Sequence, residues 1–115
     1  MKKFVAALVL AMAFHQVYAA NDKDEYVIHG HGKHSCDEFV NHKSSLFTQT
    51  YYFVWLQGYV SHYNKVTAET VDIWQDMDFN GAILWIENFC RNHPLEDVHA
   101  AAIALIDELY PKRIQ

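Results

Sequence analysis

Apolar residues recur along the chain with the spacing of an α-helix. Over residues 47–64 an aromatic residue falls at every fourth position, and further apolar residues widen this stripe. A pair of strands is the alternative, because aromatic residues and valine favour sheets, but no turn signal interrupts the stretch. The period predicts a helix in which Gly58 faces a closely crossing helix. Its one broad buried face is expected to contain Phe47, Tyr51, Trp55, Tyr59 and Tyr63.

A short helix is predicted before this long one, and a loop after it. Ser35 and Glu38 have the spacing of a capping box, in which the hydroxyl and the carboxylate satisfy the first backbone N–H groups. The helix that they open is expected to end near His42. Residues 65–75 contain β-branched residues without a sustained period, which predicts a loop with Trp74 packed on the core.

Two more helices complete the prediction. Asp78 is placed to cap a helix over residues 79–91, which carries one apolar face. Pro94 cannot continue that helix but suits the first turn of the next one. Glu96 and Asp97 would lie in the same first turn, where the helix dipole favours acidic side chains. The sequence therefore predicts a small all-α domain of four helices, one short and three longer.

The first residues have the pattern of a secretory signal peptide. Lys2 and Lys3 precede an unbroken apolar run over residues 4–14, and small residues surround the expected cleavage site after Ala19. The run is shorter than the roughly 20 apolar residues of a spanning helix, so no membrane span is expected after cleavage of residues 1–19. We expect a periplasmic protein with a mobile, histidine-rich arm over residues 20–34 and one helical domain over residues 35–115.

Cys36 and Cys90 are the two cysteines of the chain, and both lie in the expected mature part. In an oxidising compartment such a pair predicts a disulfide, which would help a domain of this size to fold. The alternative is a nucleophilic thiol paired with His34, but export works against a free thiolate. Hydrolase and phosphate-loop motifs are missing from the sequence, so we do not expect an enzyme.

The charge balance changes on cleavage. The full chain has 9 basic and 14 acidic residues, and loss of Lys2 and Lys3 leaves a mature net charge of −7 with neutral histidine. An acidic chain without a basic patch is a poor candidate for nucleic-acid binding. Seven histidines remain in the mature chain, so its charge should rise steeply as the pH falls through about 6.5 and then about 4.

Residues 76–87 match the pattern of a calcium-binding loop. Oxygen ligands stand at positions 1, 3, 5 and 12 of this pattern, and glycine stands at position 6. The alternative is that the helix begins at its cap and the acidic residues are solvated, in which case the last carboxylate cannot reach the first. The candidate calcium ligands are Asp76, Asp78, Asn80 and Glu87.

The stretch HGHGKHSC holds three histidines next to two glycines. Neutral imidazoles bind divalent transition metals, and glycines would let the chain wrap around an ion. A flexible arm loses entropy when it orders around a metal, so a solvated arm that senses pH is the favoured interpretation. The candidate ligands are His29, His31 and His34. No cofactor is expected beyond these metal candidates.

Three segments give the chain a resemblance to the small exported HdeA/HdeB-like proteins. They are SCDEF (35–39), WLQGYVSHYN (55–64) and WIENFCRNHP (85–94), followed by an alanine-rich helix. The resemblance implies a helical domain with a Cys36–Cys90 disulfide and a dimer at neutral pH. It implies an acid-stress chaperone that loosens in acid and holds unfolded periplasmic proteins. The expected client surface, or alternatively core, is formed by Tyr51, Trp55, Tyr59 and Trp85.

Two other functions remain open from the sequence. Small exported helical proteins also include immunity proteins, which block a toxin or enzyme through one tight protein contact. Metal binding through the histidines or through residues 76–87 is the third hypothesis. This chain has little lysine and much histidine, so acid switching would be expected near pH 5–6.

Overall fold

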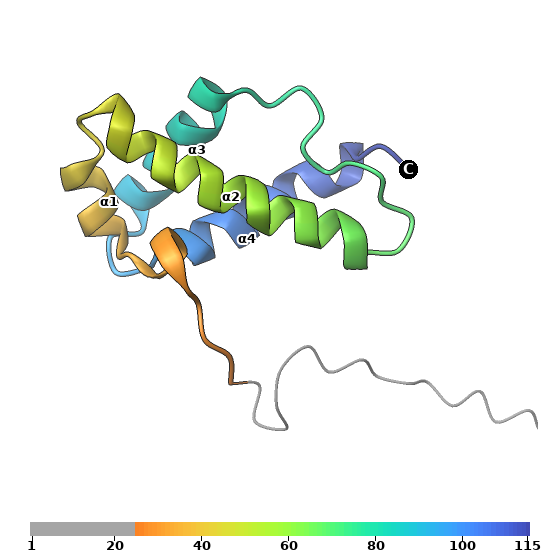
Figure 1. Ribbon diagram of the computed structural model, residues 1–115, viewed down its shortest axis with the longest axis horizontal. Helices are drawn as coiled ribbons and strands as arrows, with labels where there is room; N and C mark the ends of the chain where they lie inside the picture. Colours follow the sequence, from red (N-terminus) through yellow and green to blue (C-terminus); the bar gives the residue numbers. More distant parts are fainter. Residues whose placement is uncertain (1–24) are drawn as a thin grey trace, which may run out of the picture.

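The computed structural model describes residues 25–115, so the expected signal peptide and residues 20–24 of the arm lie outside it. Within the described part, the chain forms one compact domain of four α-helices without a strand (Figure 1), which confirms the predicted all-α fold. One helix is short and three are longer. In chain order the elements are the 3-10 turn η1 (Gly30–Lys33), α1 (Cys36–His42), α2 (Leu46–Val66), α3 (Phe79–Asn92), α4 (Val98–Leu109) and the 3-10 turn η2 (Tyr110–Lys112).

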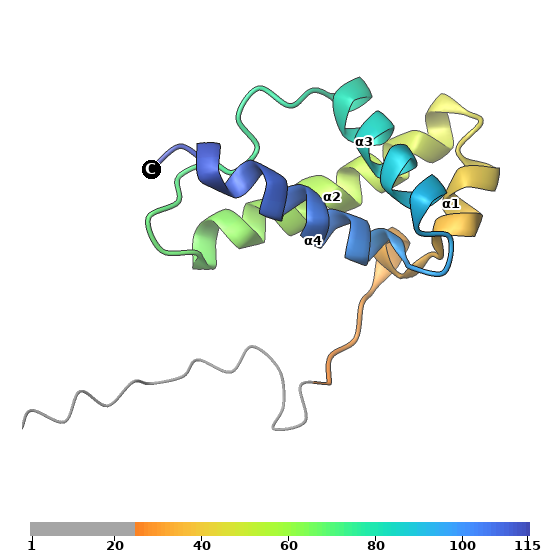
Figure 2. The ribbon, with the colours of Figure 1, turned by 180° about the vertical axis from the view of Figure 1, so that it is seen from behind.

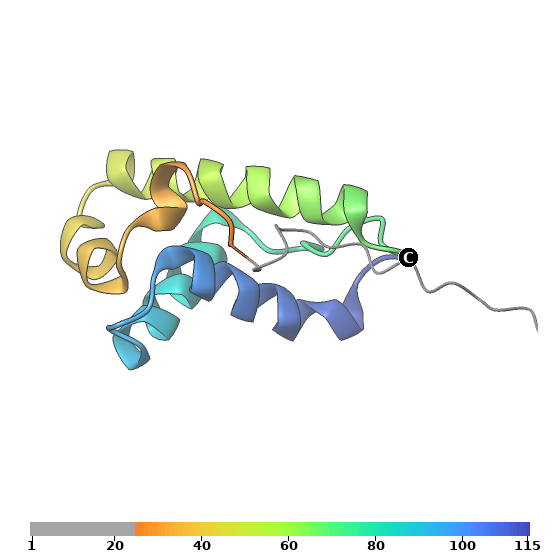
Figure 3. The same ribbon diagram turned by 90° about the horizontal axis from the view of Figure 1, so that it is seen from below.

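The helices form two layers around one core. The long α2 lies in one layer and α4 runs along it in the other, while α1 and α3 close one end (Figures 2 and 3). Contacts between α1 and α3, between α3 and α4 and between α2 and α3 join these layers. The largest fully buried side chains are Phe39, Leu56, Ile73, Leu105, Val98, Cys36 and Cys90.

The long helix buries a different face from the one predicted. Its buried residues are Tyr52, Leu56 and Val60, whereas Phe47 is 70% exposed and Tyr51 is 46% exposed. The cause is geometric: residues four apart advance about 40° around a helix of 3.6 residues per turn. Five aromatic residues at this spacing therefore spiral across the helix surface, and only the later members pack beside the core.

Gly58 lies on the outward side of α2, and the expectation of a closely crossing helix at this point is wrong. A Cβ atom built on Gly58 would meet nothing within 4 Å, because the position faces away from the buried residues of α2.

The last helix begins later than predicted. Asp97 is its N-cap residue, and its carboxylate accepts a hydrogen bond from Ala100 N at 2.7 Å. Pro94 and Glu96 therefore lie in the preceding loop. Glu96 O accepts from Cys36 N at 2.8 Å, so this loop is fixed by a tertiary hydrogen bond that the local sequence does not reveal.

The connection between α2 and α3 is irregular, and Trp74 packs against the core as predicted. The Asp72 carboxylate accepts hydrogen bonds from Trp74 N and Gln75 N, which closes a tight turn. The backbone of Asp72 also pairs with Ile114, so the end of the described chain holds this connection in place.

The open space at Gly58 gives a stability prediction. Gly58→Ala should raise the free energy of unfolding by about 0.5–1 kcal/mol, because alanine costs less entropy in an exposed helix interior. Denaturant unfolding of the oxidised protein at neutral pH measures the change. A loss of stability would show that an alanine side chain is not accommodated at this position.

Candidate functional site

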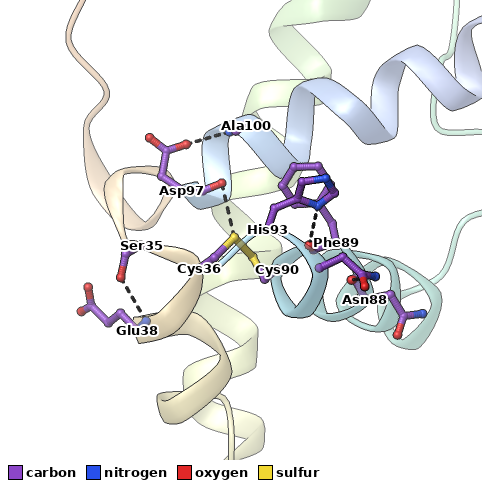
Figure 4. Close-up of a disulfide and its surroundings, with 10 residues drawn as sticks. Ser35, Cys36, Glu38, Asn88, Phe89, Cys90, His93, Asp97 and Ala100 are labelled. Atoms are coloured by element: carbon purple, nitrogen blue, oxygen red, sulfur yellow. Dashed lines mark hydrogen bonds between the residues drawn. A yellow bond between two sulfur atoms is a disulfide. The ribbon is translucent and has the colours of Figure 1, made fainter. Parts of the chain in front are cut away.

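The disulfide joins the first residue of α1 to the last turns of α3. Cys36 and Cys90 are bonded through their sulfur atoms, their Cα atoms are 4.7 Å apart, and 54 positions separate them in sequence. Both are almost fully buried. Figure 4 shows the bond between the start of α1 and the end of α3. The described chain has no free thiol, so the alternative of a thiolate nucleophile beside His34 is excluded.

The histidine-rich segment, for which a mobile arm is expected, contacts the helical domain over its last residues. Gly30–Lys33 forms a 3-10 turn that lies over Trp55 of α2. We call residues 26–34 the N-terminal strap. Trp55 Nε1 donates a hydrogen bond to His29 O at 2.9 Å, which fixes the strap to the helix.

Two glycines allow the strap to approach Trp55 this closely. Gly30 has a φ of 71°, a left-handed conformation that glycine adopts without strain. Gly32 is buried, and a Cβ atom there would overlap the ring of Trp55. The spacing of glycines that suggested a flexible arm is therefore the feature that lets the backbone pack on an indole ring.

The three histidines of the strap do not form a metal site. The rings of His31 and His34 lie side by side with centroids 4.8 Å apart, whereas His29 contributes its backbone carbonyl to Trp55. The His34 Nδ1 atom is 2.9 Å from the Tyr52 hydroxyl and 3.4 Å from a Glu38 oxygen. Over residues 25–115, no group of three histidine, cysteine, aspartate or glutamate side chains could hold a metal ion.

The strap makes two ring contacts with the helices, and each of them involves a histidine. His31 stacks on Tyr51 with ring centroids 5.1 Å apart. Tyr26 meets the edge of His99 at 5.7 Å, and His99 in turn contacts Tyr59 at 5.3 Å.

His99 is a residue of the site that none of the sequence patterns singled out. It is 8% exposed and lies in the first turn of α4 against Trp55 and Tyr59 of α2. A signal was present: residues 102 and 106, three and seven positions further on, are both in the apolar stripe of that helix.

The two packed histidines have perturbed titration. Burial lowers the pKa of His99, and the nearby Asp97 carboxylate opposes this shift. Burial and the neighbouring His34 lower the pKa of His31, while Glu38 acts in the opposite direction. Both imidazoles are therefore favoured in the neutral form when the domain is folded.

Glu87 has a structural role and does not complete a calcium loop. Its carboxylate is 2.9 Å from Lys43 Nζ and 2.7 Å from a guanidinium nitrogen of Arg91. These hydrogen bonds lower the pKa of Glu87. Because α3 begins directly after its cap Asp78, Glu87 lies more than two turns along the helix and cannot close on Asp76.

The other members of the loop pattern have a simpler explanation. Asp78 Oδ1 accepts a hydrogen bond from Gly81 N at 2.7 Å, so this residue caps the helix that Asn80 continues.

The predicted aromatic surface is divided in the structure. Tyr51, Trp55 and Tyr59 follow one another along α2 beside the strap. Trp85 lies on α3, where its Nε1 atom donates to Glu108 at 3.0 Å and its ring stacks on Phe89. The candidate site is therefore the strap with its α2 and α4 contacts, and Trp85 is a separate packing residue of the core edge.

Comparison with known family models, curated proteins and solved structures found no match to this chain. Among the residues that the structure describes, no helix has both the length and the apolar character needed to cross a membrane.

The disulfide gives the first prediction from this site. Replacing both cysteines by Cys36→Ala and Cys90→Ala should lower the free energy of unfolding by about 4 kcal/mol, because the bond closes a long loop in the unfolded chain. Denaturant unfolding of the double variant against the oxidised wild type measures the loss. A change within about 1 kcal/mol would show that the closed loop contributes little.

The histidines give a pH dependence. The unfolded chain binds a proton at each histidine near pH 6.5, whereas folded His31 and His99 bind it only at lower pH. The contribution of these two neutral histidines to the free energy of unfolding should therefore be fully present above pH 6.5. It should be lost as the pH drops through the lowered pKa values.

A pair of single variants tests this dependence. Denaturant unfolding at pH 7.5 and pH 5 should show a smaller acid loss in His99→Phe, which keeps a ring at the position. The exposed His62 of α2 offers the control, His62→Gln, which should behave as wild type. Equal acid losses in all three proteins would contradict the role of His99.

Proposed function

We propose that this protein is an exported, periplasmic acid-stress chaperone that holds unfolded proteins. The observation that carries the proposal is the outward face of the first half of α2. Four apolar residues there are strongly exposed although they share one side of a helix, and exposed apolar patches commonly mark interaction sites. These residues are Leu46 (71% exposed), Phe47 (70%), Tyr51 (46%) and Val54 (58%). We call them the α2 apolar face.

The charge of α2 suits a client in acid. Residues 46–64 contain no aspartate, glutamate, lysine or arginine. Below about pH 4, carboxylates are protonated, so both the chaperone and an unfolded client carry net positive charge. A surface without lysine or arginine lets a cationic apolar chain approach with less repulsion than the rest of the molecule would offer.

Several native contacts weaken in acid while the covalent tie remains. His31 and His99 gain charge in places that favour their neutral forms. Protonation of Glu87 removes its ion pairs with Lys43 of the α1 end and Arg91 of α3. The disulfide does not titrate, so it would keep α1 and α3 together as the packing loosens.

The resemblance to the HdeA/HdeB-like proteins supports the same function. It rests on the SCDEF, WLQGYVSHYN and WIENFCRNHP segments, and it also implies a homodimer at neutral pH. The α2 apolar face would contact a second copy of the chain at neutral pH and a client protein in acid. An immunity or inhibitor protein would instead form a tight complex with one partner at any pH, which separates the two functions by experiment.

Client protection tests the proposal. The mature oxidised protein should suppress light scattering by a dehydrogenase that is unfolded at pH 3 and then neutralised. In the variant Phe47→Ser/Val54→Ser, about fivefold more protein should be needed, equivalent to about 1 kcal/mol of lost binding. Both side chains are exposed, so the fold should be retained.

The matched control is Leu95→Ser, which removes a fully exposed apolar side chain outside α2. It should protect the client as well as wild type does. Absence of protection by the wild-type protein at pH 3, or equal protection by the α2 variant, would contradict the proposal.

A further inference from the structure

The N-terminal strap covers part of the aromatic surface of α2 and reaches α4. In Figure 3 it descends from the α2 layer towards the α4 layer. Its ring contacts follow the same path, from His31 on Tyr51 of α2 to Tyr26 on His99 of α4. Between these contacts, Gly30 and Gly32 lie over the ring of Trp55. Trp55 and Tyr59 are partly buried against the core, and the strap adds a cover over Trp55 while its Tyr26 contacts His99, the ring neighbour of Tyr59.

The two ends of the strap are held differently. At the end that leads into α1, His34 O accepts a hydrogen bond from Val98 N at 3.0 Å, and Cys36, two positions further on, is bonded to Cys90. The other end is held by the Tyr26–His99 ring contact and by the hydrogen bond from Trp55 to His29 O. The strap can therefore swing away from Trp55 about its anchored end without breaking the disulfide or any hydrogen bond within a helix.

We propose that the N-terminal strap is a proton-released cover, which leaves Trp55 and Tyr59 when His31 and His99 become charged, while the helices stay folded. As a gate for client binding it rests on the proposed function, whereas the opening itself does not. Release would extend the α2 apolar face along the helix by two large aromatic rings.

The groups around His99 explain the direction of the switch. Tyr26 from the strap and Trp55 and Tyr59 from α2 surround the His99 ring, and none of these side chains carries a negative charge that could pair with an imidazolium. The Asp97 carboxylate at the start of α4 favours the charged imidazole, but it also accepts the Ala100 N–H. A proton on His99 thus places a charge among three aromatic rings, and separation of the strap admits water to it.

The groups around His31 act in the same direction. Tyr51 and Tyr52 of α2 surround its ring, and His34 adds a second imidazole at 4.8 Å. Glu38 of α1 opposes release while it is ionised.

Fluorescence of Trp55 tests the opening directly. The variant Trp74→Phe/Trp85→Phe leaves Trp55 as the sole tryptophan of the mature chain. In the oxidised protein, Trp55 emission should shift to the red and acrylamide quenching should rise as the pH falls below 6.5. Far-UV circular dichroism should show retained helix content across this transition.

Two pairs of variants in this background separate the causes. Gly32→Ala should expose Trp55 already at pH 7.5, because its Cβ atom overlaps the ring, whereas Gly58→Ala should not. His31→Phe/His99→Phe keeps both rings without their charge and should move the Trp55 transition down by about one pH unit or more. His62→Gln should leave the midpoint unchanged.

Each outcome decides between closed and released straps. Trp55 quenching that stays constant until helix content is lost would overturn the proposal, as would an unchanged midpoint in the double histidine variant. If that variant does not fold, the comparison of Gly32→Ala with Gly58→Ala still decides whether the strap covers Trp55. Light scattering with the client at pH 3 is scored separately: opening without protection refutes the chaperone function, and protection without opening refutes the strap.

Discussion

The Cys36–Cys90 disulfide is the constraint on which the rest of the domain depends. Cys36 is the first residue of α1 and lies two positions after the end of the strap, and its backbone N–H donates a hydrogen bond to Glu96 O just before α4. The disulfide therefore ties α1 to α3, and the backbone hydrogen bonds beside it tie the start of α4 and the anchored end of the strap to the same point. Because a disulfide does not respond to pH, this arrangement persists when ionic and histidine contacts change.

The second organising feature is that α2 has apolar residues on two opposite sides. One side buries Tyr52, Leu56 and Val60, while the opposite side exposes apolar residues without any charge. Such a face is a liability for solubility unless something uses or covers it. The strap covers the aromatic row at Trp55 and contacts Tyr51, whereas Leu46, Phe47 and Val54 stay exposed.

The sequence predicted what depends on local spacing. Ser35 and Asp78 cap helices as expected, and the two cysteines pair. The strap could not be predicted, because its 3-10 turn is held by Trp55, which lies 26 positions from His29 in sequence. The burial of His99 depends in the same way on α2 and the strap. The buried face of α2 was misjudged because residues four apart do not stay on one side of a helix.

The types of titrating group decide which contacts of the domain weaken first as the pH falls. The strap contacts involve His31 and His99, whose pKa values burial lowers from the ordinary histidine value, so their neutral forms are lost only as the pH falls through those lowered values. The tie between α1 and α3 depends on ionised Glu87, whose pKa is lowered by Lys43 and Arg91. The ordinary pKa of a glutamate already lies below that of a histidine, and these ion pairs lower it further. The proposed opening over Trp55 would therefore precede any loosening of α1 from α3, so aromatic surface is released from a domain whose far end is still intact.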